Sequence, residues 1–193
     1  MDYKGALSAI QKQQMKTFCS LDKFRDNLPV KRRGLYWIWT KLSLDELLRI
    51  PTRQGTKEVP IADLVRMRRE LNNICSITND EYRIVFNGIG GYRTAARSFG
   101  LRERINQELN CNDRRTGTLN LLNRDPDQYT SDDAEMKKQW KSQWAVSFFD
   151  FDIPENLAIL EKYGFGNNCY NEYANALELS WRIEFGVPIL TRN

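Results

Sequence analysis

The sequence predicts an α/β (α+β) fold in which a small three-stranded sheet is flanked by helices. Segments 34–40, 81–87 and 144–151 are rich in aromatic and β-branched residues, as strands are. The segments around them carry apolar residues at helical spacing. The chain has 193 residues, of which 41% are hydrophobic, so it is long enough to bury one core without disulfides or metal.

The chain begins with an amphipathic helical segment over residues 1–28, which Pro29 ends. We expect residues 1–32 to form a helical extension and residues 33–193 to form the domain, with an insertion at about 42–80. A polar stretch over 112–135 predicts a loop. Further helices are expected at residues 43–50, 60–74, 98 to about 110, 154–163 and 170–185. In the second strand, period-2 alternation places Tyr82, Ile84 and Phe86 on one side.

Charge and cysteine usage narrow the class of protein. The net charge is only +4, but arginines cluster, as a phosphate-binding surface requires. The four cysteines form no C-x-x-C pair and the chain has no histidine, so a structural zinc site is not expected. No segment approaches a membrane span in length, and no apolar leader stands at the N-terminus. We therefore expect a soluble, cytoplasmic protein that does not bind membranes.

Four short matches in order resemble the GIY-YIG nuclease family. Gly34-Leu35-Tyr36 is similar to the first signature of the family, with leucine for isoleucine, and Phe86-Asn87-Gly88 is similar to the second. Arg104 matches the arginine of an R-x-x-x-H arrangement, with Glu108 where histidine often stands. Glu178, on the last expected helix, matches the metal-binding glutamate. The resemblance covers roughly residues 33–193, interrupted by the insertion.

The resemblance implies a metal-dependent DNA endonuclease that uses one Mg²⁺ or Mn²⁺ ion. Glu178 would be the metal ligand and Arg104 would stabilise the negative charge of the phosphate. Tyr36 would be the base or would position the attacking water, and nearby arginine and metal charge would have to lower its pKa. The expected partner is double-stranded DNA. Whether the protein forms a homodimer is left open by the sequence. The expected DNA contacts are Arg93, Arg97 and Arg102, with Arg66 and Arg69 from the inserted helix.

Two departures from the family pattern leave alternatives open. Phe86 replaces the second signature tyrosine, whose hydroxyl Tyr92 could supply from the following loop. Glu108 could act as a second base or metal partner, or pair with Arg104 as an exposed ion pair. Glu178 has the same spacing to Arg182, and Tyr36 could be an ordinary strand residue. The alternative function is a catalytically inactive nucleic-acid-binding or assembly protein on the same core, and a third is a protein-interaction domain.

Overall fold

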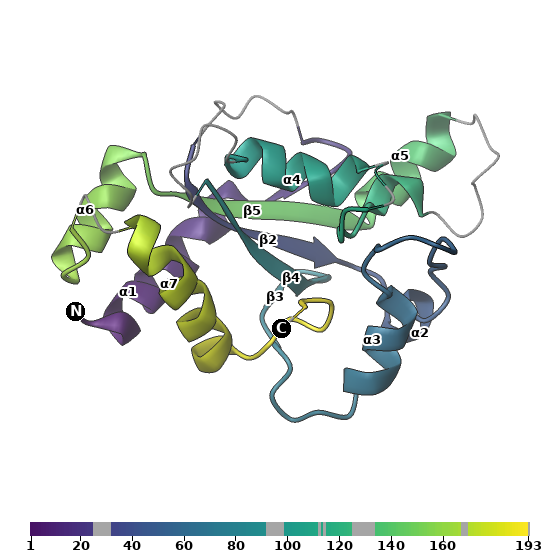
Figure 1. Cartoon of the computed structure of the whole chain (residues 1–193), viewed down its shortest axis with the longest axis horizontal. Helices are drawn as coiled ribbons and strands as arrows, with labels where there is room; N and C mark the ends of the chain where they lie inside the picture. Colours follow the sequence, from purple (N-terminus) through teal and green to yellow (C-terminus); the bar gives the residue numbers. More distant parts are fainter. Residues whose placement is uncertain are drawn as a thin grey trace.

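The computed structural model describes residues 1–24, 32–91, 99–111, 113, 115–124, 134–166 and 170–192. Its centre is a five-stranded antiparallel sheet with the order β1-β5-β2-β4-β3 (Figure 1). The strands are β1 (Cys19–Ser20), β2 (Gly34–Thr40), β3 (Thr78–Asn79), β4 (Tyr82–Gly90) and β5 (Trp144–Asp150).

The prediction of a three-stranded sheet is wrong, because two short strands extend the sheet at its edges. β1 pairs with β5 over two residues, and β3 pairs with the beginning of β4 over two residues. A strand of two residues is too short to show the period-2 alternation by which a strand is recognised. The three long strands β2, β4 and β5 are those expected from the sequence, and β2 lies between the other two.

The described residues form seven α-helices and two short 3-10 helices. The bounds are α1 (Tyr3–Gln14), η1 (Met15–Thr17), α2 (Leu44–Leu47), α3 (Ile61–Arg68), α4 (Leu101–Asn110), η2 (Leu121–Asn123), α5 (Ala134–Ser142), α6 (Pro154–Lys162) and α7 (Tyr170–Phe185). Six of the α-helices lie in segments expected to be helical. The sequence analysis did not predict α5, in which no residue is fully buried and few apolar side chains pack against the core.

The two faces of the sheet bury separate cores, and β2 contributes to both. Its residues Tyr36 and Ile38 face α4, whereas Leu35, Trp37 and Trp39 face the opposite side. Figure 1 shows α4 on one side of the sheet and the pair α1 and α7 on the other. All seven residues of β2 are buried, as expected for a central strand that is covered on both faces.

A β-bulge at Val85 changes the phase of β4. In the β2–β4 register, Ile38 pairs with Phe86 and Trp39 pairs with Ile84, so Val85 is an extra residue. Val85 and Phe86 both pack in the core on the α4 side, whereas Ile84 packs on the opposite side. The expectation that Phe86 shares a face with Tyr82 and Ile84 is therefore wrong.

Candidate active site

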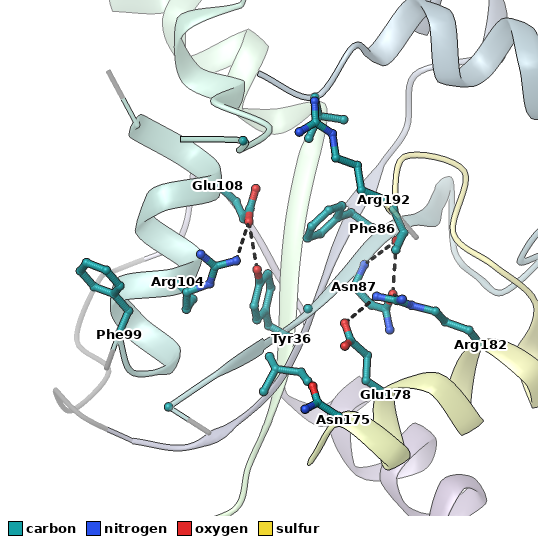
Figure 2. Close-up of a pocket in the computed structure, with 16 residues that line it drawn as sticks. Tyr36, Phe86, Asn87, Phe99, Arg104, Glu108, Asn175, Glu178, Arg182 and Arg192 are labelled. Carbon is teal, nitrogen blue, oxygen red and sulfur yellow. Dashed lines mark hydrogen bonds and ion pairs between the residues drawn. The ribbon is translucent and has the colours of Figure 1, made fainter. Parts of the chain in front are cut away.

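A pocket of about 700 Å³ lies beside β4 and is lined by side chains from both faces of the sheet. Its walls come from β2, β4, α4 and α7, and from the segments around residues 117 and 191–192. Tyr36, Arg104, Glu108 and Glu178 all line it (Figure 2). Three elements that are far apart in the sequence, β2, α4 and α7, therefore bring these four residues to one cavity.

Tyr36 reaches the pocket because the residue opposite it on β4 has no side chain. Gly88 is the register partner of Tyr36, and a Cβ atom at this position would lie 2.4 Å from the tyrosine hydroxyl. The ring of Phe86 packs beside that of Tyr36, with 6.1 Å between the centroids. The second signature-like segment thus supplies space and an apolar wall for Tyr36 rather than a second hydroxyl.

The hydroxyl of Tyr36 donates a hydrogen bond to Oε1 of Glu108 at 3.1 Å. The other carboxylate oxygen, Oε2, accepts a hydrogen bond from the backbone N–H of Leu119 at 2.8 Å. Arg104, one helical turn before Glu108 on α4, places Nη2 3.6 Å from Oε1. Since only 1% of the Glu108 side chain is exposed, the interpretation of Arg104 and Glu108 as an exposed ion pair is wrong.

Burial determines the protonation of this pair. Burial raises the pKa of Tyr36 well above its usual value, the negative charge of Glu108 raises it further, and Arg104 opposes the change. The expectation of a lowered tyrosine pKa is therefore wrong for the chain itself. Burial also raises the pKa of Glu108, although the N–H of Leu119 and the charge of Arg104 favour the carboxylate. Tyr36 keeps its proton near neutral pH, and Glu108 is positioned to accept it.

Glu178 enters the pocket from α7 and is held by Arg182, one turn later. Oε1 of Glu178 accepts a hydrogen bond from Nη2 of Arg182 at 2.6 Å. Nε of Arg182 donates to Oδ1 of Asn87 at 3.0 Å, and the hydroxyl of Thr191 donates to the same oxygen at 3.2 Å. Burial raises the pKa of Glu178, opposed by the charges of Arg182 and Arg104. The ion pair expected from the spacing of Glu178 and Arg182 is thus present inside the pocket.

The donor atoms in the pocket suit a divalent cation that keeps most of its water ligands, rather than one that is enclosed by protein ligands alone. Mg²⁺ is commonly held by one or two carboxylates and keeps several waters. Glu178 supplies one carboxylate, and Asn175, one turn earlier on α7, lines the same pocket with an amide. Among the residues that the structure describes, no group of three or more acidic or cysteine side chains gathers as a metal cage would require.

The residues expected to contact DNA lie outside this pocket or outside the described chain. Arg66 on α3 pairs with Asp63 at 2.7 Å, and Arg69 pairs with Glu70 at 3.2 Å. Arg102 lies on α4 but does not line the pocket. Tyr92, Arg93 and Arg97 fall outside the described residues.

The sequence interpretation missed four polar pocket residues, which are Asn87, Asn175, Thr191 and Arg192. Asn87 stands inside the second signature-like segment, but alternation alone gave no reason to place it beside Glu178. Thr191 and Arg192 arrive through the turn after α7, where Leu190 N–H donates to the Val85 carbonyl at 2.8 Å. No local pattern marks that contact.

Comparison with models of protein families, with curated proteins and with solved structures found no match for this chain. Within the described part of the chain, each helix is too short or too polar to cross a membrane.

Proposed function

We propose that the protein is a divalent-metal-dependent endonuclease that hydrolyses phosphodiester bonds of DNA. The observation that carries this proposal is the meeting of Tyr36, Arg104 and Glu178 in one pocket. They come from β2, α4 and α7, three elements that are distant in the sequence. A phenol, a guanidinium and a carboxylate around one cavity suit water attack on a phosphodiester.

Glu108 and Tyr36 together would handle the proton of the attacking water. Tyr36 already donates a hydrogen bond to Glu108, and the raised pKa of Glu108 makes this carboxylate a stronger proton acceptor. As water attacks phosphorus, its proton passes to the phenol oxygen while the phenol proton passes to Oε1 of Glu108. The base is then a tyrosine–glutamate relay, and no tyrosinate has to form before the attack.

The remaining pocket residues act on the phosphate and its leaving group. Arg104, whose side chain is one-third exposed, faces the cavity and would neutralise charge that builds on the non-bridging oxygens. Glu178, with Asn175 beside it, would hold the metal ion, which when bound polarises the phosphate and stabilises the leaving oxygen. Arg182 orients Glu178 and competes with the cation for Oε1.

Nicking of supercoiled plasmid DNA in the presence of Mg²⁺ tests the proposal. Glu178→Ala should lose about 10³-fold in rate, which corresponds to about 4 kcal/mol of barrier. Glu184→Ala is the matched control, because Glu184 is an exposed residue on the same helix. Equal nicking by the wild type and by Glu178→Ala would remove Glu178 from the mechanism.

The second candidate is a nucleic-acid-binding or assembly protein without catalysis. It is favoured by the arginine contacts of both pocket carboxylates, Glu108 with Arg104 and Glu178 with Arg182. Such a protein would bind DNA with a steep dependence on salt and without any need for metal. DNA binding without cleavage in any divalent cation would support it, and absence of binding at low salt would favour a protein-interaction domain instead.

A further inference from the structure

Arg192 lies on the opposite side of the pocket from Arg104 and is seated by two features of the fold (Figure 2). Its Nη2 donates a hydrogen bond to the backbone carbonyl of Glu58 at 2.9 Å. Its Nη1 lies against Gly117, where a Cβ atom would approach to 2.6 Å. The absence of a side chain at position 117 therefore leaves the space that this guanidinium occupies.

Arg192 has no ion-pair partner within contact distance among the described residues, although its charge acts from farther away to favour the carboxylate of Glu108. The other two arginines of the pocket each face a carboxylate, Arg104 that of Glu108 and Arg182 that of Glu178. Among the described residues, no carboxylate lies within ion-pair distance of Arg192, and its hydrogen-bond partner is a neutral carbonyl. A guanidinium that is held in place while its charge stays available is suited to bind a phosphate.

The size of the pocket leaves room for more than the reacting group. A volume of about 700 Å³ is in the range of sites for ligands much larger than one phosphate ion. Phe86 lines the pocket as an apolar surface, in addition to the polar side chains that face it. The cavity thus presents two guanidinium groups that could each bind a phosphate, those of Arg104 and Arg192.

We propose that Arg192 binds a second phosphate of the DNA backbone, next to the phosphodiester that is cleaved. This inference rests on the proposed function and adds a subsite to it. Arg104 would act on the reacting phosphate, and Arg192 would fix the position of the strand by holding its neighbour. Phosphate contacts of this kind fix the register of a protein on DNA, and they do so without reading the base sequence.

The salt dependence of DNA binding tests this subsite without metal or cleavage. The probe is a fluorescein-labelled DNA duplex, titrated in EDTA at a series of salt concentrations and followed by anisotropy. Each phosphate contact contributes about 0.9 to the slope of log K against log salt concentration. Arg192→Gln should lower this slope by about 0.9, whereas Arg192→Lys should keep it, because the charge remains.

Two further variants separate the subsite from charge and folding effects. Gly117→Ala should lower the slope as Arg192→Gln does, because the new Cβ displaces the guanidinium from its seat. Lys12→Gln, an exposed position on α1, removes the same charge away from the pocket and should leave the slope unchanged. Thermal unfolding identifies any variant that is not folded, and the other pocket variant then carries the test.

The possible outcomes distinguish this inference from the proposed function. If the wild type cleaves DNA but neither Arg192→Gln nor Gly117→Ala changes the slope, the second subsite is wrong and the nuclease proposal stands. If Lys12→Gln lowers the slope equally, net charge accounts for the effect and the subsite is again wrong. If the wild type neither binds nor cleaves DNA, both proposals fail.

Discussion

Two buried glutamates, Glu58 and Glu108, lie in different settings and titrate in opposite directions. Their exposures are nearly equal, at 2% and 1%. Burial acts to raise the pKa of both, yet the pKa of Glu58 is lowered from its usual value whereas that of Glu108 is raised. Glu108 is surrounded by more protein than Glu58, and the partners of the two carboxylates also differ, so both the surroundings and the partners contribute to the difference.

Glu58 has enough donors to hold its negative charge. Arg53 donates to Oε1 at 2.6 Å, and Arg124, itself fully buried, places Nη2 3.1 Å from Oε2. The amide of Asn120 donates to Oε1 at 2.7 Å. These contacts join the segments around residues 53–59 and 120–124 behind the pocket wall that contains Val59. We therefore assign the contacts of Glu58 a structural role, the stabilisation of these two segments.

Glu108 has fewer and weaker cationic contacts. Among the described residues, one guanidinium lies within ion-pair distance, that of Arg104 at 3.6 Å, and that of Arg192 acts from farther away. One of the two hydrogen-bond partners of Glu108 is a phenol that can exchange a proton. A buried carboxylate in this condition is destabilised as an anion and gains a proton readily. The glutamate with more cationic partners serves stability, whereas the one with fewer close cationic partners is available for chemistry.

The largest expected effect is on catalysis at Glu108. Glu108→Gln keeps an oxygen that can accept the Tyr36 hydrogen bond but cannot take up the proton. Loss of a proton acceptor of this kind should lower the cleavage rate by about 10³-fold. Urea unfolding near neutral pH should show unchanged or higher stability, because an ionised buried group is removed. A wild-type cleavage rate in this variant would show that Glu108 is not the acceptor.

The next effect is on stability at the other glutamate. Arg124→Met removes one cation from Glu58 and leaves the carboxylate buried, so the free energy of unfolding should fall by about 3 kcal/mol. Urea denaturation measures it, with Arg49→Met, an exposed arginine beside α2, as the control that should stay within about 0.5 kcal/mol. Cleavage per folded molecule should be unchanged. Stability equal to that of the control would show that Arg124 does not stabilise the fold through Glu58.

The smallest effect is the pH dependence of stability, which should have opposite signs at the two sites. The raised pKa of Glu108 gives stability that is complete below the unfolded-state value and is lost as pH rises through the folded-state value. The lowered pKa of Glu58 gives stability that is present above the unfolded-state value and is lost as pH falls through the folded-state value.

Urea unfolding of the wild type, Glu108→Gln and Glu58→Gln between about pH 4 and pH 8 measures both trends. Relative to Glu108→Gln, the wild type should lose stability as pH rises, and relative to Glu58→Gln it should gain stability. Each pKa unit of displacement corresponds to about 1.4 kcal/mol. Trends of the same sign at the two sites would show that burial alone governs both carboxylates.

The sequence predicts the long elements of the fold better than its edges. The aromatic and aliphatic run of β2 and the similar run of β5 mark strands through composition, and both agree closely with the structure. β1 and β3 escape prediction because their pairing is made by backbone atoms over two residues each. α5 escapes because none of its side chains is fully buried and few of them pack against the core, Trp140 among these, so its apolar residues show little helical periodicity.

In the candidate site, the sequence indicates which residues meet but not how they are paired. The order of Tyr36, Arg104 and Glu178 suggests a common pocket, and the structure places all three there. The contact between Tyr36 and Glu108 joins residues 72 positions apart, and no spacing rule reports it. The direction of the Tyr36 pKa also depends on burial, which a strand pattern does not quantify.

The extra residue in β4 affects how this chain has to be aligned with any distant sequence. On the two sides of Val85, odd and even positions exchange their orientation toward α4. An alignment that treats residues 82–90 as one uninterrupted strand therefore matches Gly88 with positions that belong to the other layer. One gap opposite Val85 restores the phase and brings the glycine beneath Tyr36 into correspondence with its structural equivalents.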